Sequence, residues 1–386
     1  MFIKKAFKDC DNILLFFTIL LCVFGLFNIV TVSSQEVTNK MIDESIYYYF
    51  YRQLIMIIIG LVPALIIVFM PIKRLYKYIP ILFIGAVVVN ILTIIYGGFT
   101  RGATNWLPIG PIKFQPSEFS KPIMILTVAY LFEFFRKPLQ NPKTDHEKMI
   151  FIILICGFLI PAIVFVQKDI GTCAIIAGSF LVMFIFSPLS KKDKLFAFKW
   201  IGILGLCLAA IYILAKGSLL SNAQSSRLNY INPCQTSKYK GEGYQVCNAF
   251  IAINKGGLTG VGIGKSTQKY SYIPEPHTDM VFAIISEEYG FVVGFIIIFS
   301  YLIMIWRILN LATYASTITG RYICLGVATF IFLHIFINLG GLFGIIPLTG
   351  VPLPFLSYGG SFIVALLVSM DLVQRVHIDT KRAKII

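Results

Sequence analysis

Long apolar stretches recur along the whole chain, and short polar or glycine-containing segments separate them. A helix of about 20 apolar residues crosses the roughly 30 Å hydrocarbon layer of a membrane. Ten stretches come close to this length and predict helices over residues 12–32, 53–70, 77–97, 119–135, 149–166, 172–187, 198–215, 280–305, 321–341 and 358–374. We therefore expect an all-α integral membrane protein that forms a single polytopic membrane domain over residues 1–386.

The positively charged residues predict the orientation of this helix bundle. Lys and Arg concentrate in the short loops on the side of the two termini, for example at Lys73, Arg74 and Lys77. Short loops rich in Lys and Arg stay in the cytoplasm, and an even number of spans leaves both termini on one side. We expect cytoplasmic termini and a large extracellular loop, residues 216–279, between the seventh and eighth helices.

The composition agrees with a membrane protein and excludes other classes. Of the 386 residues, 57% are hydrophobic and 13% are charged, which is more apolar surface than a soluble domain of this size can bury. The formal net charge is +15, and its cations form clusters that flank the apolar stretches. Anionic lipid headgroups explain such clusters, whereas a nucleic-acid-binding protein gathers its cations with aromatic residues on one domain. No nucleic-acid partner is expected.

Two of the eight cysteines differ in position from the others. Cys234 and Cys247 lie 13 positions apart in the long external loop, while the rest lie in or beside predicted helices. Cysteines within helices are ordinarily small buried hydrophobes. A disulfide between Cys234 and Cys247 is expected if the compartment is oxidising, and two free thiols are the alternative.

Three external segments are long or rich in Gly and Pro, namely 98–118, 216–279 and 342–357. Loops of this length on a rigid scaffold are usually functional. The first segment carries Arg101 and Trp106 and ends at Glu118, with Lys121 three residues later. Glu118 and Lys121 can pair as ordinary helix-start residues. They can equally form a functional site, because ionisable groups at a membrane boundary are costly.

The second external segment contains five glycines between positions 256 and 264. Glycine permits close approach of the backbone to a ligand, and Lys255, Lys265 and Lys269 can counter the charge of a pyrophosphate. The segment matches neither a Walker loop nor a dinucleotide fingerprint, since no βαβ unit accompanies it.

His277, Thr278 and Asp279 come directly before the predicted helix 280–305. Thr278 and Asp279 can cap that helix, and a functional carboxylate at Asp279 is the equally weighted alternative. Within the helix, only Glu287 can share a cavity with Asp279, because Glu288 lies on the opposite face.

The third external segment is apolar and full of helix breakers, and it ends near Ser357. Irregular backbone at membrane depth must be buried in protein or line a cavity. The segment therefore suits a groove for an isoprenoid chain.

These motifs together resemble the SEDS family (shape, elongation, division and sporulation), of the FtsW and RodA type. The resemblance covers nearly the whole chain, and its carriers are Gly102-Ala103 with Trp106, Gln115-Pro-Ser-Glu118-Phe, Gln167-Lys-Asp169-Ile-Gly171-Thr172, Pro274-Glu-Pro-His-Thr-Asp279 and Pro352-Leu-Pro-Phe-Leu-Ser-Tyr-Gly-Gly360-Ser361. Two positions depart from the family pattern. Asn105 stands where many members carry Arg, and Lys168 replaces a proline.

The resemblance implies a peptidoglycan glycosyltransferase in the bacterial cytoplasmic membrane. Such an enzyme polymerises lipid II, which carries an undecaprenyl chain, beside a class B penicillin-binding protein and other members of a division or elongation complex. The essential external aspartate of the family maps to Asp279, and its loop tryptophan and glutamate map to Trp106 and Glu118. The segment from Gly260 to His277 resembles the division and sporulation branch more than the elongation branch.

Glycan polymerisation needs a base and an anion stabiliser. Asp279 is the candidate base for the acceptor hydroxyl, and the candidates for the departing pyrophosphate are Arg101, Lys121, Lys265 and Lys269. His277 and Ser357 are further candidates for substrate contact. Alternatively, Asp279 holds a divalent cation, Mg²⁺ or Mn²⁺, at the pyrophosphate. The rival functions are a flippase for a lipid-linked precursor and a scaffold without activity.

Overall fold

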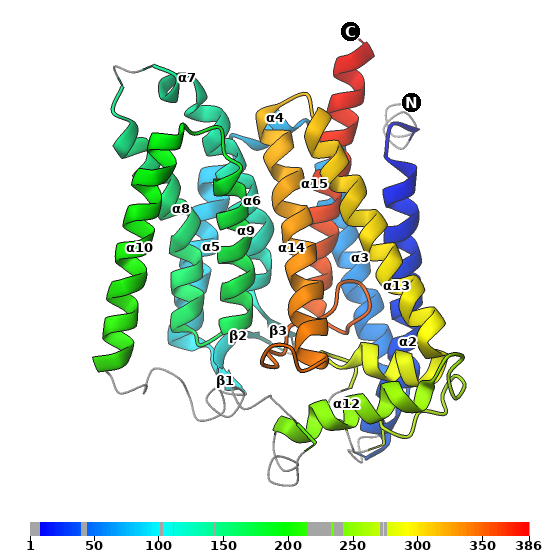
Figure 1. Ribbon diagram of the computed structural model, residues 1–386. Helices are drawn as coiled ribbons and strands as arrows, with labels where there is room; N and C mark the ends of the chain where they lie inside the picture. The colour runs from blue at the N-terminus through cyan, green and yellow to red at the C-terminus, as the bar shows by residue number, and fades with distance from the viewer. Residues whose placement is uncertain are drawn as a thin grey trace.

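The computed structural model describes residues 8–39, 45–100, 103–110, 112–141, 144–214, 233–234, 242–270, 273 and 276–385. Long helices dominate it and run side by side as a bundle (Figure 1). These helices are α2 (Asn12–Asn39), α3 (Tyr48–Phe69), α5 (Ile79–Tyr96), α6 (Pro116–Phe134), α8 (His146–Val166), α9 (Ile170–Ile185), α10 (Lys191–Leu214), α13 (Val281–Tyr314), α14 (Ile318–Leu342) and α15 (Gly360–Ile385).

Each predicted span coincides with one of these helices, so the all-α membrane class is confirmed. In the described part of the chain, seven helices are long and apolar enough to cross a membrane, namely α2, α3, α5, α8, α13, α14 and α15. Helix α9 is apolar but shorter, and α6 carries Glu118, Lys121 and Glu133. The count of ten membrane spans therefore stays a prediction.

The functional segments and the termini lie at opposite ends of the bundle. Both termini emerge at one end, together with the short helices α4 (Ile72–Leu75) and α7 (Arg136–Leu139) (Figure 1). The other end holds the strands, the helix α12 (Glu242–Gly256) and the segment 343–359 between α14 and α15. This arrangement agrees with the predicted placement of both termini on one side.

Two elements at the outer end were not predicted. Strands β1 (Gly98–Thr100), β2 (Ala103–Ile109) and β3 (Ile112–Phe114) form a small antiparallel sheet in the order β1-β2-β3. Helix α12 lies across the end of the bundle within the predicted loop 216–279 (Figure 1). Its buried residues Val246, Ala249 and Ala252 recur at helical spacing and face the bundle, and α12 packs on α13.

Helix α14 occupies the centre of the bundle and positions the outer segments. It packs against α6, α9, α13 and α15, whereas α10 lies at the edge beside α8. Polar side chains on α14 therefore reach several helices and loops at once.

Candidate functional site

Asp279 lies at the outer end of the bundle, two residues before the first residue of α13. The helix begins after Met280, which makes no side-chain cap. The Thr278 hydroxyl donates to Oδ1 of Asp279 at 3.3 Å. Asp279 as a whole is 8% exposed, which leaves little room for movement of its carboxylate.

Asn338 on α14 holds the backbone of Asp279 against the segment 343–359. Its side-chain amide donates to the carbonyl oxygen of Asp279 at 2.8 Å and to that of Val351 at 2.8 Å. At Gly350, where φ is +74°, an added Cβ would lie 3.9 Å from Oδ2 of Asp279. The Asp279 carboxylate therefore lies beside the backbone of this segment. The buried Asn338 amide holds the two segments together.

Glu118 and Lys121 form a buried ionic group with His334 of α14. The Lys121 ammonium lies 2.7 Å from both carboxylate oxygens of Glu118 and 3.0 Å from Nε2 of His334. The other ring nitrogen of His334, Nδ1, lies 3.1 Å from the carbonyl oxygen of Pro352. Lys121 is 1% exposed, so the ion pair is fully enclosed.

The hydrogen-bond partners of His334 determine which ring nitrogen carries the proton. The Pro352 carbonyl can only accept a hydrogen bond, so Nδ1 carries the proton and Nε2 accepts from Lys121. All three N–H donors of Lys121 are then used within the protein. The predicted pair of Glu118 and Lys121 is confirmed. Their charges compensate each other and join α6 to α14 and the segment 343–359, while their contact with substrate stays a prediction.

The outer sheet, which consists of β1, β2 and β3, is attached to the start of α9. Asp169 caps α9 by accepting from the backbone N–H of Thr172 at 3.0 Å. Its other carboxylate oxygen accepts from the side chains of Asn105 at 2.7 Å and Gln115 at 3.1 Å. Trp106 follows Asn105 in β2 and is half-buried. The departure from the family pattern at Asn105 thus places an amide donor against Asp169.

The glycine-rich segment 256–264 packs at Gly256 and Gly260 against a break in α13. At Gly290, φ is 79° and ψ is −178°, which interrupts the helix. A Cβ at Gly256 would lie 1.9 Å from the carbonyl oxygen of Ser286, and one at Gly260 would lie 2.3 Å from that of Glu288. The prediction of a ligand cradle at Gly256 and Gly260 is therefore wrong, because the backbone of α13 already fills this space.

The acids of α13 bind the same external segment. The Glu287 carboxylate accepts from the backbone N–H groups of Thr267 at 2.9 Å and Gln268 at 3.2 Å, and it lies 3.6 Å from Nζ of Lys255. Glu287 is thus engaged by the external segment, and a cavity that it shares with Asp279 stays a prediction.

Only one of the three predicted external lysines has an open ammonium. The ammonium of Lys269 lies 2.8 Å from Glu288, with both side chains buried, so Lys269 is not a free cation for pyrophosphate. The ammonium of Lys255 donates to the Thr267 hydroxyl at 2.7 Å beside Glu287. Lys265 is exposed, and within the described residues its ammonium has no bonded partner.

His277 and Ser357 occupy packed positions. The His277 ring lies 4.4 Å from Tyr49 and 5.4 Å from Tyr358, measured between centroids. Burial raises the pKa of Tyr358 above its ordinary value. The Ser357 hydroxyl accepts from the backbone N–H of Leu353 at 2.8 Å and closes a turn. Ser357 is buried, so its role in this structure is to shape the segment.

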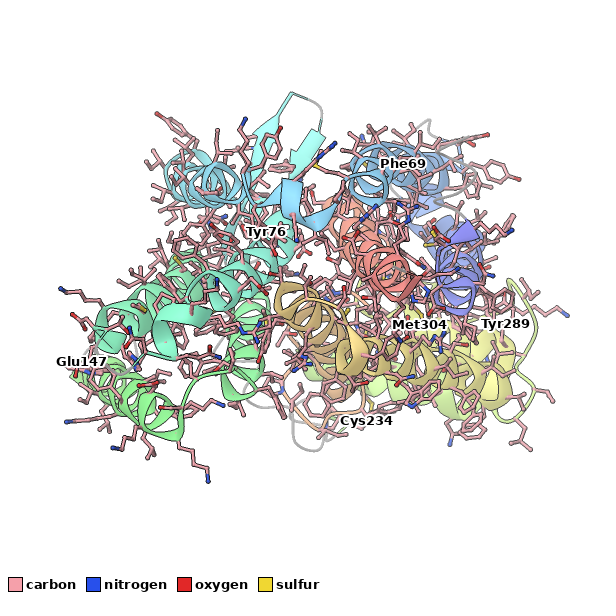
Figure 2. The ribbon with its side chains drawn as sticks, turned by 90° about the horizontal axis from the view of Figure 1, so that it is seen from above. Phe69, Tyr76, Glu147, Cys234, Tyr289 and Met304 are labelled. Atoms are coloured by element: carbon pink, nitrogen blue, oxygen red, sulfur yellow. A yellow bond between two sulfur atoms is a disulfide. The ribbon has the colours of Figure 1, made fainter. Side chains whose placement is uncertain are left out.

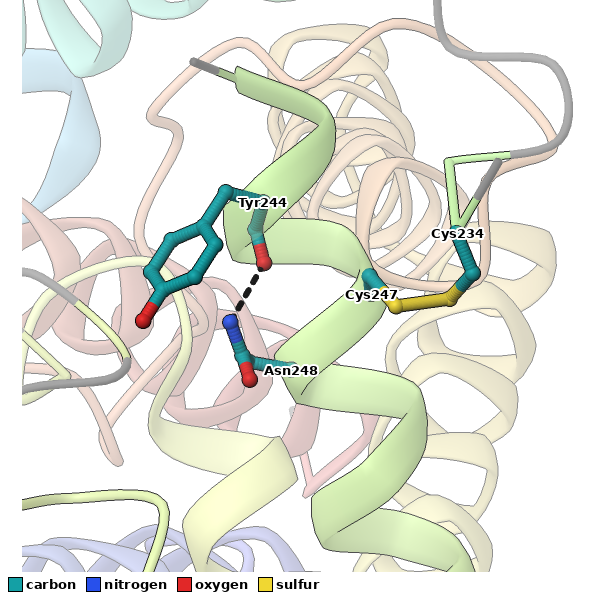
Figure 3. The surroundings of a disulfide bond; sticks show 4 residues. All are labelled: Cys234, Tyr244, Cys247 and Asn248. Carbon is teal, nitrogen blue, oxygen red and sulfur yellow. Dashed lines mark hydrogen bonds between the residues drawn. A yellow bond between two sulfur atoms is a disulfide. The ribbon is translucent and has the colours of Figure 1, made fainter. Parts of the chain in front are cut away.

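A disulfide joins Cys234 to Cys247 on α12, with Cα atoms 5.0 Å apart (Figure 3). On the same helix, the Asn248 side chain donates to the carbonyl oxygen of Tyr244 at 2.8 Å. The bridge ties the external loop to α12. Arg101, the remaining predicted cation, lies outside the described residues.

Residues 12–382 match the FtsW/RodA/SpoVE family of cell cycle proteins. The chain belongs to this family. A probable peptidoglycan glycosyltransferase FtsW of Bacillus subtilis is 32% identical over 98% of the chain and 93% of its own length. The stage V sporulation protein E of the same organism is 30% identical over 95% and 96%. The peptidoglycan glycosyltransferase MrdB of Escherichia coli is 30% identical over 98% and 97%.

Solved structures share the fold of this chain. A chain from a structure described as the structural coordination of polymerization and crosslinking by a peptidoglycan synthase complex has a TM-score of 0.71. It is 23% identical and covers 96% of this chain and 98% of its own. The rod shape determining protein RodA of Thermus thermophilus has a TM-score of 0.67 at 23% identity, over 96% and 97%. Family membership and the apolar helices make this chain a multi-pass protein of the bacterial cytoplasmic membrane.

Sequence reasoning missed His334 and Asn338, the two α14 residues that join the outer segments. Both are polar residues inside an apolar stretch, and such residues within a membrane span are costly unless they have a partner. That signal was present in the sequence. It does not reveal the partners, however, because Lys121, Asp279 and Val351 are distant along the chain.

Proposed function

We propose that this FtsW/RodA/SpoVE family member is a peptidoglycan glycosyltransferase that polymerises lipid II at the outer face of the cytoplasmic membrane. Relatives from two organisms carry that activity in their names. The observation that carries the proposal for this chain is the position of Asp279. Its carboxylate lies at the outer end of the bundle, and Asn338 holds its backbone against the segment 343–359. A rigid carboxylate at this depth suits chemistry on a lipid-linked substrate.

The proposed reaction joins two sugars and releases a lipid pyrophosphate. The 4-hydroxyl oxygen of the acceptor sugar attacks the anomeric carbon of the donor, and a new C–O bond forms. The bond between that carbon and the pyrophosphate oxygen breaks, and its electron pair leaves with the undecaprenyl pyrophosphate. Asp279 accepts the hydroxyl proton as general base.

A divalent cation is the alternative role for Asp279. In the described part of the chain, no group of three His, Cys, Asp or Glu side chains is placed to hold a metal ion. The single carboxylate of Asp279 fits Mg²⁺ or Mn²⁺ that is also bound by the pyrophosphate and water, since such ions often take few protein ligands. When bound, the cation would neutralise charge on the leaving group.

Two of the candidate cations for the leaving pyrophosphate are already paired with carboxylates. Lys121 and Lys269 are committed to Glu118 and Glu288. Lys265 is exposed on the segment that follows α12, and we assign the pyrophosphate contact to it and to Arg101.

The segment 343–359 supplies the apolar surface for the isoprenoid chain. Phe343 and Ile345 are exposed beside Gly344, which has φ of 65°. Exposed apolar side chains next to helix breakers at the outer end of the bundle suit a prenyl tail.

A class B penicillin-binding protein is the proposed partner, within a division or elongation complex. Support comes from the similar fold found in a solved synthase complex that coordinates polymerization and crosslinking. The relatives FtsW, stage V sporulation protein E and MrdB are 32%, 30% and 30% identical to this chain, so these values do not separate the branches. We keep the division and sporulation branch as the proposed assignment, on the glycine-rich segment and the residues that follow it.

Replacement of Asp279 tests the proposal. We expect Asp279→Asn to lower the rate of glycan polymerisation from lipid II by about 100-fold or more, since general bases contribute at least this much. The full chain is purified with its penicillin-binding partner, and glycan strands are separated on gels. Asp145→Asn, at an exposed helix cap far from the outer end, is the matched control and retains activity.

Two further measurements separate the alternatives. Titration with Mg²⁺ or Mn²⁺ after chelation restores the wild-type rate only if Asp279 acts through a cation. Undiminished polymerisation by Asp279→Asn removes both roles of the residue. Transport of lipid II across vesicles without polymer formation identifies a flippase, and polymer formation by the partner alone identifies a scaffold.

A further inference from the structure

A hollow lies at the end of the bundle that bears the termini, between the end of α3, α4 and the start of α5. Its volume is about 340 Å³, which is within the range of small-molecule sites. It is lined by Met70, Lys73, Arg74, Lys77 and Tyr78. We propose that this hollow binds the phosphate headgroup of an anionic phospholipid from the cytoplasmic leaflet.

The hollow is positively charged and therefore attracts an anion. Lys73, Arg74 and Lys77 lie within five positions of one another and line the same space. In the described part of the chain, no acidic side chain pairs with any of the three. Like charges so close together repel one another, and a phosphate between them turns this repulsion into attraction.

Two acids close to α4 and Tyr76 have partners of their own. Asp379 of α15 accepts from the Arg375 guanidinium and, at 3.3 Å, from the backbone N–H of Ile72 in α4. Glu133 of α6 accepts from the backbone N–H of Thr319 at 3.3 Å. Both carboxylates have other partners, and within the described residues neither pairs with Lys73, Arg74 or Lys77.

Exposed apolar side chains beside the hollow favour a lipid over a soluble anion. Ile66 on α3 is 53% exposed, one turn before Met70, and Ile81 on α5 is 69% exposed, three residues after Tyr78. Helices α3 and α5 stand apart when viewed from this end, and the segment leading to Tyr76 runs between them (Figure 2). A phosphate in the hollow places its acyl chains along these apolar faces, and basic pockets of this kind bind anionic headgroups.

A lipid in this position would brace two parts of the bundle. Helix α3 packs on α15, whereas α5 packs on α6. The α4 segment connects α3 and α5, so a headgroup held by its cations contacts both parts. This role is independent of the chemistry at Asp279, which lies at the opposite end.

Lipid binding to a triple variant tests the proposal. The full chain is purified in detergent, and native mass spectrometry measures retention of phosphatidylglycerol against phosphatidylcholine. We expect Lys73→Gln, Arg74→Gln and Lys77→Gln together to weaken phosphatidylglycerol binding about 100-fold, since each cation near a membrane surface contributes roughly 1 kcal/mol. The matched control neutralises Lys191, Lys192 and Lys194 at the start of α10 and retains binding.

Two outcomes overturn the proposal. Equal losses in the triple variant and its control mean that phosphatidylglycerol responds to total surface charge. Competition by inorganic phosphate at millimolar concentration, abolished by the same substitutions, means that the hollow takes a soluble anion. If the triple variant does not fold, Arg74→Gln alone replaces it, with an expected loss of about fivefold and Lys192→Gln as its control.

Discussion

Single side chains connect segments that are far apart in this sequence. Asn338 bridges the carbonyl groups of Asp279 and Val351, and His334, one turn earlier on α14, bridges Lys121 and Pro352. Both side chains are buried, so each hydrogen bond they make is costly to lose. At the residue scale, α14 therefore positions the outer segments through two polar contacts.

Asn338→Asp tests the positioning of Asp279. The new carboxylate faces two carbonyl oxygens and repels both, which displaces the Asp279 backbone. We expect kcat for glycan polymerisation to fall by about 100-fold, since a shift of about 1 Å costs this much, while KM for lipid II changes less than about twofold. Steady-state kinetics of the purified complex provide both values.

Asn28→Asp is the matched control for this variant. Asn28 is also a buried amide that donates to a carbonyl oxygen, but the acceptor, Phe24, belongs to its own helix α2. A purely structural role predicts that both variants lower the melting temperature and leave kcat alone. Equal kcat in Asn338→Asp and the wild type contradicts the positioning role.

The ion pair between Glu118 and Lys121 predicts a non-additive effect on stability. Lys121→Met leaves the Glu118 carboxylate buried without its cation and should cost about 3–5 kcal/mol. The double variant Glu118→Gln with Lys121→Met removes both charges, so we expect it to be more stable than Lys121→Met alone. Unfolding in detergent, followed by circular dichroism, measures both, and a double variant that is the less stable of the two contradicts the pairing.

At the scale of elements, the outer end is built by close backbone packing. Helix α12 and the segment after it lie on the break of α13, where Val261 and Gly262 donate to the carbonyl oxygens of Glu287 and Glu288 at 2.9 and 3.0 Å. The sequence predicts close approach of the backbone to a ligand at these glycines. It does not reveal that the approaching group is α13, because the partner depends on how the chain folds back.

Gly256→Ala tests this packing. The added methyl group would meet the Ser286 carbonyl oxygen, so α12 must move away from α13, and we expect a loss of about 3 kcal/mol. Gly85→Ala on α5 is the control, because nothing lies within 4 Å of its added Cβ. It should be neutral or stabilising by about 1 kcal/mol, as alanine favours helices. The melting temperatures of both variants in detergent measure these effects. Equal melting temperatures would exclude the close contact between Gly256 and Ser286.

At the scale of the whole molecule, the two ends of the bundle differ in chemistry. The end with the termini carries basic clusters on α4, α7 and the start of α10. The opposite end carries the sheet of β1, β2 and β3, helix α12, the disulfide and Asp279. Because short basic loops remain in the cytoplasm, the end with Asp279 should face outward.

Accessibility labelling tests this orientation. A membrane-impermeant maleimide added to intact cells should label Lys265→Cys on the outer segment. It should leave Lys192→Cys at the start of α10 unlabelled until the cells are opened. The parent chain, with its own cysteines, supplies the background. Labelling with the opposite pattern contradicts an external Asp279 and with it the proposed reaction.

Local patterns in the sequence determined much of this protein. Runs of apolar residues locate the long helices, because a membrane span needs length and hydrophobicity that can be counted along the chain. Motifs such as Gln115-Pro-Ser-Glu118 indicate the family for the same reason, since their residues are contiguous. The short strands and α12 escaped prediction, because elements inside polar loops give weak periodic signals.

Only the tertiary structure decided which charged and polar groups are free to act. For Lys121 the sequence leaves two alternatives, a pair with Glu118 or a substrate contact, and the structure pairs it with Glu118. Lys269 is predicted as a cation for pyrophosphate, yet the buried carboxylate of Glu288 neutralises it. In the sequence Asn338 is an isolated polar residue, yet its side chain holds the backbone of Asp279 in place. The pair of Glu118 and Lys121 is local and its spacing predicts it, but the contacts of Lys121 with His334 and of Asn338 with Asp279 join segments that are far apart along the chain. Composition and spacing carry no information about the distances between such segments.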